Sequence, residues 1–170
     1  MCHNLSHVFC PYSVITNEIQ VLIKFLMPMI RFTGALVPVE GEKFFVTVEN
    51  KRINDVFYWH RKFEKDNKVY EFNSKMQQFG IDIVEFVGFG IGIRMGLKVS
   101  DGGIVYEDKG YVLKLGKKLI SIPLHLLVGK SVIEEYVSTN NSNDLNMKFE
   151  VHHPWFGFAF SYSGYFNCIN

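Results

Sequence analysis

From residue 44 onward, the chain consists of short segments in which large apolar residues alternate with smaller or charged ones. The clearest segment runs from Ile91 to Val99, where every second residue is Ile, Met, Leu or Val. Residues 101–103, with the sequence Asp-Gly-Gly, follow it, and another apolar segment begins at Ile104. A period of two is typical of a β-strand with one buried face, and Asp-Gly pairs favour hairpin turns. The sequence therefore predicts a β-hairpin around residues 101–103.

The other segments share this alternation or the same enrichment in Val, Ile and aromatic residues, which favour strands. They cover residues 44–48, 56–63, 69–76, 81–87, 110–115, 119–126, 131–138, 147–153 and 156–166. Aromatic residues make up 15% of the chain, and Gly- and Asn-containing turns separate the segments. About nine or ten short strands predict a mainly β (α+β) fold, either a curved antiparallel sheet or a partly closed β-barrel, because curling protects the sheet edges.

The region before the strands has a different pattern. Within residues 16–27, Ile and Leu recur at the spacing of one helical face, and Pro28 ends the segment. The sequence therefore predicts one N-terminal amphipathic helix that packs over a face or an end of the sheet. We expect residues 1–15 to form a disordered leader and residues 16–170 to form a single domain, because a chain of 170 residues suits one domain.

Charge and cysteine content narrow the classes of partner. Eighteen Lys and Arg residues against 17 Asp and Glu residues give a net charge of +1, which argues against nucleic acid as a partner. The three cysteines, Cys2, Cys10 and Cys168, lack metal-ligand spacing, so we predict no metal site and no cofactor, and a reducing compartment. The apolar stretch 15–30 is interrupted by charged residues and is too short to span a bilayer. We therefore expect a cytoplasmic or membrane-peripheral protein.

One charged residue lies on an apolar strand face. In the segment 56–63, the period of two places Arg61 beside Trp59 and Phe63. A buried guanidinium needs a carboxylate, because breaking a buried ion pair costs several kcal/mol. Each face of the segment 131–138 carries one glutamate, and we choose Glu134 as the partner of Arg61. Such a pair would either fix the register of the strands or bind a ligand.

Two further residues are candidates for the same site. Tyr136 shares the strand face of Glu134, and His153 ends an apolar strand face just before a proline. A histidine in that position is either a structural residue with satisfied hydrogen bonds or, less simply, part of a catalytic cluster with Arg61 and Glu134, which would require three strands to converge. The candidate ligand-binding residues are Trp59, Arg61, Phe63, Glu134, Tyr136 and His153.

The glycine-rich segment 88–96, GFGIGIRMG, resembles a phosphate-binding loop only superficially. A dinucleotide-binding loop follows a strand and opens a helix, whereas the residues after Gly96 continue to alternate as a strand. Glycines at every second position leave one strand face bare. This arrangement suits a sharp bend or close backbone contact, or the wall of a cavity.

Several sequence pieces in succession give a family resemblance. They are FFVTVEN at 44–50, WHRKF at 59–63, EFNSKM at 71–76, IVEFVG at 83–88, SIPLHLLVG at 121–129, SVIEEY at 131–136 and HHPWFGFAFSYSGYF at 152–166. In order and spacing the chain resembles the bacterial family called domain of unknown function 4166, especially its YndJ-like members from bacilli. The resemblance extends from about residue 22 to residue 166 and marks these positions as matching: Trp59, Arg61, Phe63, Glu134, His153, Pro154 and Gly157.

The resemblance implies an all-β core, and it attaches no enzymatic activity to the domain. Members of the family usually begin with a longer helical part and a glycine-containing segment, so the resemblance implies a shortened N-terminal part in this chain. Family domains often follow a membrane region or a nucleotide-binding, oxidoreductase-like domain. A membrane-associated or oxidoreductase-like protein is therefore an expected partner.

Three functions are compatible with the sequence. The first is a non-enzymatic binding module whose aromatic-lined pocket accepts a lipid-like or other apolar small molecule, since such pockets combine apolar walls with a few polar groups. The second is a structural or docking domain with a filled core. The third is an enzyme that uses Arg61, Glu134 and His153, which no local motif supports.

Overall fold

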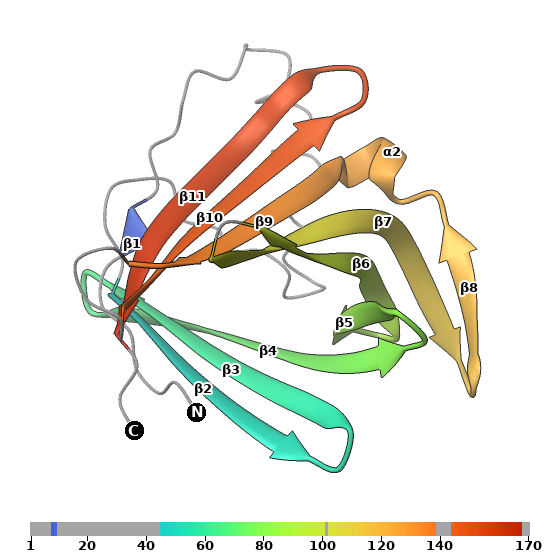
Figure 1. The fold of residues 1–170 in the computed structure, drawn as a ribbon, viewed down its shortest axis with the longest axis horizontal. Helices are drawn as coiled ribbons and strands as arrows, with labels where there is room; N and C mark the ends of the chain where they lie inside the picture. The colour runs from blue at the N-terminus through green and yellow to red at the C-terminus, as the bar shows by residue number, and fades with distance from the viewer. Residues whose placement is uncertain (1–7, 10–44, 101, 139–143, 168–170) are drawn as a thin grey trace.

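The computed structural model describes residues 8–9, 45–100, 102–138 and 144–167. These residues form one antiparallel sheet, in the order β1-β11-β10-β9-β7-β6-β5-β4-β3-β2, with β8 paired to β7 (Figure 1). The strands are β1 (Val8–Phe9), β2 (Phe45–Ile53), β3 (Val56–Lys65), β4 (Lys68–Phe79), β5 (Asp82–Gly88), β6 (Ile91–Ser100), β7 (Gly103–Leu115), β8 (Lys118–Ile122), β9 (Lys130–Val137), β10 (Asp144–His153) and β11 (Gly157–Asn167). The short helix α2 (His125–Val128) lies between β8 and β9.

The sheet is strongly curved. Strands β2 to β4 form one wall and β9 to β11 the other, and β5 to β7 connect them at the bend (Figure 1). The register shifts between Phe86 and Gly88 in β5 and beside Ile93 and Met95 in β6, and β-bulges of this kind increase the bend of a strand. The described strands leave β1 and β2 at the two ends of the order, so the sheet is open and is not a closed barrel.

The predicted sheet and its 101–103 hairpin are confirmed, and three expectations need revision. The segments predicted to begin at Ile104 and to cover 110–115 are one strand, β7, because a bulge near Gly110 (φ 105°) interrupts the alternation and not the strand. The strand expected over 119–126 ends at Ile122, since Pro123 lacks the N–H that a ladder requires and α2 follows. The barrel is not closed, and the helix expected over 16–27 lies outside the described residues.

The glycine-rich segment 88–96 forms a tight turn and a bend. Phe89 and Gly90 connect β5 to β6 with positive φ angles of 48° and 78°, and the Lys114 N–H donates to the Gly90 carbonyl at 2.8 Å. A Cβ atom at Gly92 would lie 2.6 Å from Val84 Cγ1 and 2.9 Å from the Phe86 ring. The prediction of bending and close contact is thus confirmed for this segment.

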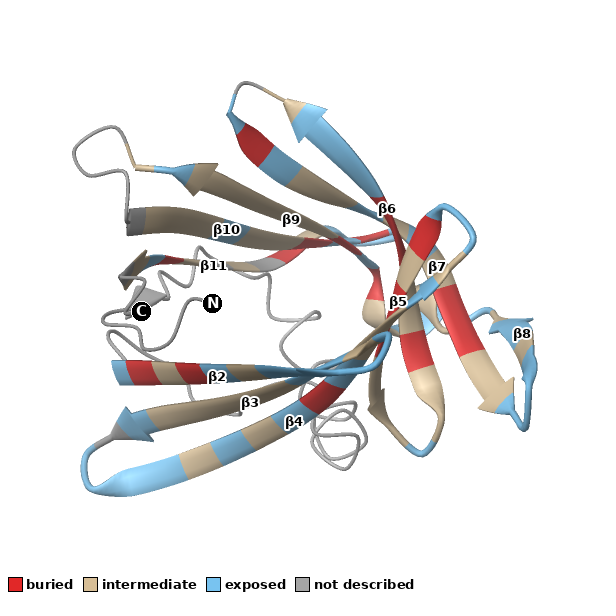
Figure 2. Ribbon diagram, turned by 60° about the horizontal axis from the view of Figure 1, so that its bottom comes forward, coloured by how far each residue is buried: buried red, intermediate tan, exposed pale blue. Residues whose placement is uncertain are grey.

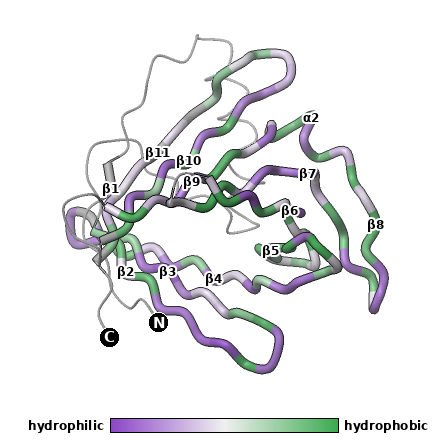
Figure 3. Tube along the Cα trace, in the orientation of Figure 1, coloured by the Kyte–Doolittle hydropathy of each residue, from purple (hydrophilic) through white to green (hydrophobic). Residues whose placement is uncertain are grey.

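Buried residues lie on both faces of the sheet. On the inner, concave face they include Val46 and Val48 of β2 and Met95 of β6, and on the outer face Val84 and Val112. Figure 2 shows them on β2 and along β5 to β7. Figure 3 shows hydrophobic and hydrophilic residues alternating along the strands. The concave face is therefore formed by two walls of the same sheet on either side of the bend.

Candidate ligand-binding site on the concave face

Strand register places the predicted aromatic and basic residues of β3 on the concave face. Arg61 lies opposite Phe72 of β4 and Val48 of β2, and Trp59 lies opposite Ser74. Directly opposed residues in antiparallel strands share a face, so Trp59, Arg61 and Phe63 point to the same side as the buried valines of β2. The predicted orientation of Arg61 is confirmed by its partly buried contacts.

Arg61 is held by a compact polar network. Its Nη2 lies 3.0 Å from Oε1 of Glu85, and its Nη1 donates to the Ser74 hydroxyl at 2.9 Å. The Ser74 hydroxyl in turn donates to Glu85 Oε1 at 2.6 Å. The Glu85 side chain is only 9% exposed, so hydrogen bonds and the opposite charge of Arg61 replace its contacts with water. Three adjacent strands are thereby tied together at one point of the concave face.

Aromatic rings enclose the guanidinium. The Arg61 Cζ atom lies 5.2 Å from the ring centroid of Trp59 and 5.2 Å from that of Phe72, which are cation–π distances. The Trp59 Nε1 atom is buried and has no hydrogen-bond partner among the described residues. A buried N–H donor without an acceptor costs about 1–3 kcal/mol. This corner of the concave face therefore offers one unused donor beside a positive charge.

A second polar pair lies on the same face, between β7 at the bend and β9 of the other wall. The Tyr106 hydroxyl of β7 donates to Glu135 Oε2 of β9 at 3.1 Å. Burial raises the pKa of Glu135, whereas the Tyr106 hydrogen bond and the charge of Arg61 act to lower it. Burial likewise raises the pKa of Tyr106, so the phenol keeps its proton and remains a donor.

The electrostatic effect of Arg61 on Glu135 is informative because their strands are far apart in the sheet. Strands β4 to β7 separate β3 from β9 along the sheet order. Nevertheless, the charges of Arg61 and Glu85 both influence the pKa of Glu135. The curvature of the sheet therefore brings these charges within electrostatic range of one another, and all three side chains lie on the concave face, where we call them the concave cluster.

The predicted partner of Arg61, Glu134 of β9, is wrong: Arg61 pairs with Glu85 of β5. Glu134 lies opposite Lys148 and points to the outer face together with Tyr136, while the adjacent Glu135 points inward. Both faces of that strand carry two apolar residues and one glutamate, so the alternation alone could not decide between them. The direct partner is Glu85, a lone carboxylate in the apolar run IVEFVG, and that isolation was the signal that could have found it.

His153 has a structural environment. Its Nε2 lies 3.1 Å from the Leu126 carbonyl and its Nδ1 accepts the Trp155 N–H at 3.3 Å, which assigns the ring proton to Nε2. The ring also packs on Phe156 at a centroid distance of 4.8 Å. The interpretation of His153 as a histidine with satisfied hydrogen bonds is confirmed.

The catalytic cluster considered from the sequence is not assembled. Arg61 is bound to Glu85 and Ser74 on the concave face, Glu134 is on the outer face, and His153 is bound to Leu126 near the turn between β10 and β11. Of the six candidate residues, only Trp59, Arg61 and Phe63 share one stretch of the concave face. Ser74, Glu85, Tyr106 and Glu135 join them and were not predicted.

The described part of the chain contains no group of three His, Cys, Asp or Glu side chains that could hold a metal ion. Among the same residues, no helix is long and apolar enough to cross a membrane.

Comparison with known families supports the succession of motifs noted in the sequence. The sequence model described as "Domain of unknown function (DUF4166)" matches residues 15–166. The chain belongs to the DUF4166 family. A search of curated proteins found no match. The matched residues include both walls of the sheet and therefore every residue of the concave cluster.

Proposed function

We propose that this DUF4166 domain is a non-enzymatic binding module that holds a lipid-like or other apolar ligand against its concave face. The polar end of the ligand lies at the Arg61 cluster, and its apolar part lies along the walls. Aromatic and aliphatic side chains share that face with the cluster: Val46, Val48, Phe63, Phe72, Met76, Ile93, Met95, Ile133 and Phe149. An apolar lining with a few convergent polar groups is the usual composition of a small-molecule site.

The unused donor of Trp59 is the observation that carries this proposal. Buried polar groups are almost always paired, and the Trp59 indole lies against the Arg61 guanidinium, whose own partners Ser74 and Glu85 leave this N–H without an acceptor among the described residues. An acceptor oxygen at the polar end of a ligand would satisfy the Trp59 N–H while facing the positive charge of Arg61. The proposal includes a cytoplasmic or membrane-peripheral location and kinship with the YndJ-like bacterial proteins.

Native mass spectrometry of the purified protein tests the proposal. We expect a stoichiometric apolar passenger, which lipid extraction would then identify by class. The Trp59→Leu variant should carry less of this passenger, whereas Tyr165→Leu should carry as much as the wild type, because Tyr165 is an exposed aromatic residue on the outer face of β11.

A bare protein mass, together with an unchanged Tm across a panel of fatty acids and phospholipids, would overturn the binding module. The alternative is then a structural or docking domain for a membrane-associated or oxidoreductase-like partner. Equal loss of passenger in the Trp59→Leu and Tyr165→Leu variants would also count against the concave face as the site.

A further inference from the structure

The outer face of the same strands carries a row of alternating lysines and aromatic residues. Lys51 of β2 lies opposite Tyr58 of β3, Tyr58 lies opposite Lys75 of β4, and Lys75 lies opposite Phe86 of β5. Directly opposed residues are neighbours on one face. The row therefore runs across four neighbouring strands, perpendicular to their direction. We call these four residues, together with Lys114, the lysine–aromatic row.

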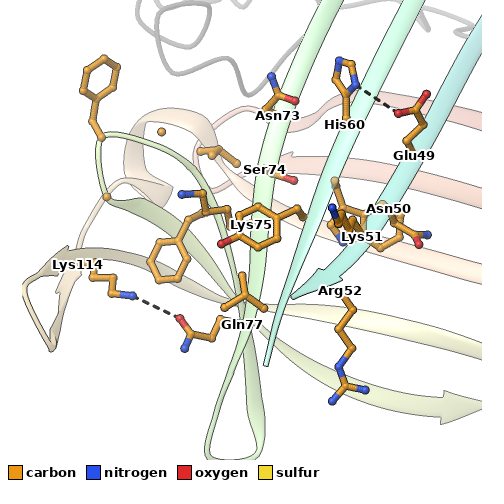
Figure 4. Close-up of a pocket in the computed structure, with 18 residues that line it drawn as sticks. Glu49, Asn50, Lys51, Arg52, His60, Asn73, Ser74, Lys75, Gln77 and Lys114 are labelled. Carbon is orange, nitrogen blue, oxygen red and sulfur yellow. Dashed lines mark hydrogen bonds and ion pairs between the residues drawn. The ribbon is translucent and has the colours of Figure 1, made fainter. Parts of the chain in front are cut away.

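Lysine ammonium groups lie over the rings of this row. Lys75 Nζ is 5.5 Å from the ring centroid of Tyr58, and Lys114 Nζ, from β7, is 5.1 Å from that of Phe86. Lys114 Nζ also lies 3.4 Å from Gln77 Oε1, a long hydrogen bond (Figure 4). Cation–π contacts restrict flexible lysine side chains and leave N–H donors for another acceptor. The charges are thus positioned before any ligand arrives.

Gly92 makes this arrangement possible. It lies opposite Phe86 in β6, and a Cβ atom there would lie 2.9 Å from Phe86 Cδ1 and 2.6 Å from Val84 Cγ1. The missing side chain lets the Phe86 ring lie against β6. Lys114, two residues beyond the Val112 that pairs with Gly92, then reaches over that ring from β7. The glycine-rich segment therefore shapes this part of the outer face.

The row lines an open cleft of about 1130 Å³. Lys51, Lys75 and Lys114 of the row line it, and one carboxylate, Glu49, is part of the lining. Arg52 also lines the cleft, but it lies on the other face of β2, over the ring of Phe57. The Glu49 carboxylate lies on the rim, 3.9 Å from His60 Nδ1 (Figure 4). The whole chain has a net charge of only +1, so positive charge is concentrated here.

We infer that this cleft binds a multiply charged, phosphate-bearing anion. Lysine is a common phosphate ligand because its ammonium group is a compact charge with several donors. The ammonium groups cover the ring faces of Tyr58 and Phe86, which leaves those faces occupied and disfavours base stacking as the mode of binding. The phosphate would lie between Lys75 and Lys114, with Lys51 as a third cation. The lysines of the row lie on the opposite face of the sheet from Arg61, and the lining of the cleft also includes Trp59 and Ser74 at the border with the concave face.

Titration calorimetry with pyrophosphate tests the site. We expect saturable binding that weakens as salt is raised, and a dissociation constant at least about tenfold higher in the double variant Lys75→Gln/Lys114→Gln, since this variant removes two of the charged donors that face the anion. The matched control is Lys117→Gln/Lys118→Gln, which removes the same charge at the β7–β8 turn outside the cleft. The control should bind pyrophosphate like the wild type.

A second arm identifies the source of the phosphate. Flotation with phosphatidylglycerol vesicles, compared with phosphatidylcholine vesicles, shows whether the group is presented by an anionic lipid surface. Binding to phosphatidylglycerol that Lys75→Gln/Lys114→Gln abolishes and the control retains supports the site with a lipid headgroup as its source, and binding to pyrophosphate alone supports it with a soluble phosphate. Failure of both probes, or an equal loss in the two double variants, would overturn the inference.

Discussion

The two faces of strands β3 to β5 use similar residues in opposite ways. On the concave face, Arg61 is paired with Glu85 and enclosed by the rings of Trp59 and Phe72. On the outer face, Lys75 lies over a ring that is itself exposed. Both faces combine cations with aromatic rings. They differ in what the cation pairs with: Arg61 pairs with the buried Glu85, whereas the buried carboxylate of the outer face, Asp82, pairs with Arg94 and Lys109 and not with the lysines of the row.

Burial explains why the carboxylate decides this difference. A charge removed from water needs an opposite charge and hydrogen bonds, whereas an exposed ammonium group is already solvated. The inner network should therefore affect the stability of the fold strongly, and the outer row should affect binding with little effect on stability. Mutations at corresponding positions on the two faces can test this contrast.

The largest effect is expected for Glu85→Ala. Loss of this carboxylate leaves Arg61 without its opposite charge and Ser74 without its acceptor, so the free energy of unfolding should fall by about 3–5 kcal/mol. Urea unfolding followed by circular dichroism measures the change. The control is Glu134→Ala on the outer face, which we expect to stay within about 0.5 kcal/mol of the wild type. Similar losses for both variants would contradict the structural role of the inner network.

A smaller loss is expected for Gly92→Ala, which tests the packing of the outer row. The new Cβ atom would force Val84 or Phe86 to move, and overpacking of this kind costs about 1–3 kcal/mol. Because Phe86 is one of the two neighbours, the cost should be smaller in a Phe86→Ala background, as a double-mutant cycle would show. Strictly additive effects would mean that the Phe86 ring does not depend on the bare strand face.

The alternation of residues predicted the strands and the inward orientation of Arg61, because a period of two directly reflects the two faces of a sheet. It could not predict the partner of Arg61. Glu85 and Arg61 are 24 residues apart, and only the pairing of β3, β4 and β5 brings them together. Likewise, the lysine–aromatic row depends on the register of four strands, and no local spacing within any one of them reveals it.

The pH dependence of stability sharpens the contrast further. Burial raises the pKa of Glu135 above its ordinary value of 4.5, so the folded protein binds this proton more tightly than the unfolded chain. The resulting stabilisation is complete below the ordinary value and is lost as pH rises through the raised pKa. Glu135→Gln should remove that loss, so its advantage in Tm over the wild type should grow between about pH 4 and pH 8. A constant difference between the two proteins across this range would show that Glu135 does not titrate as a buried group.

The smallest effect on stability is expected for the double variant Lys75→Gln/Lys114→Gln. Both ammonium groups contact rings near the surface, and surface substitutions usually change the free energy of unfolding by no more than about 0.5 kcal/mol. Urea unfolding of this variant, beside Glu85→Ala under the same buffer, provides the measurement. A loss comparable to that of Glu85→Ala would mean that the outer lysines hold the sheet together as the inner charges do. Near-wild-type stability combined with weakened pyrophosphate binding would separate the two faces by function, because stability would then depend on the paired charge and anion binding on the exposed ones.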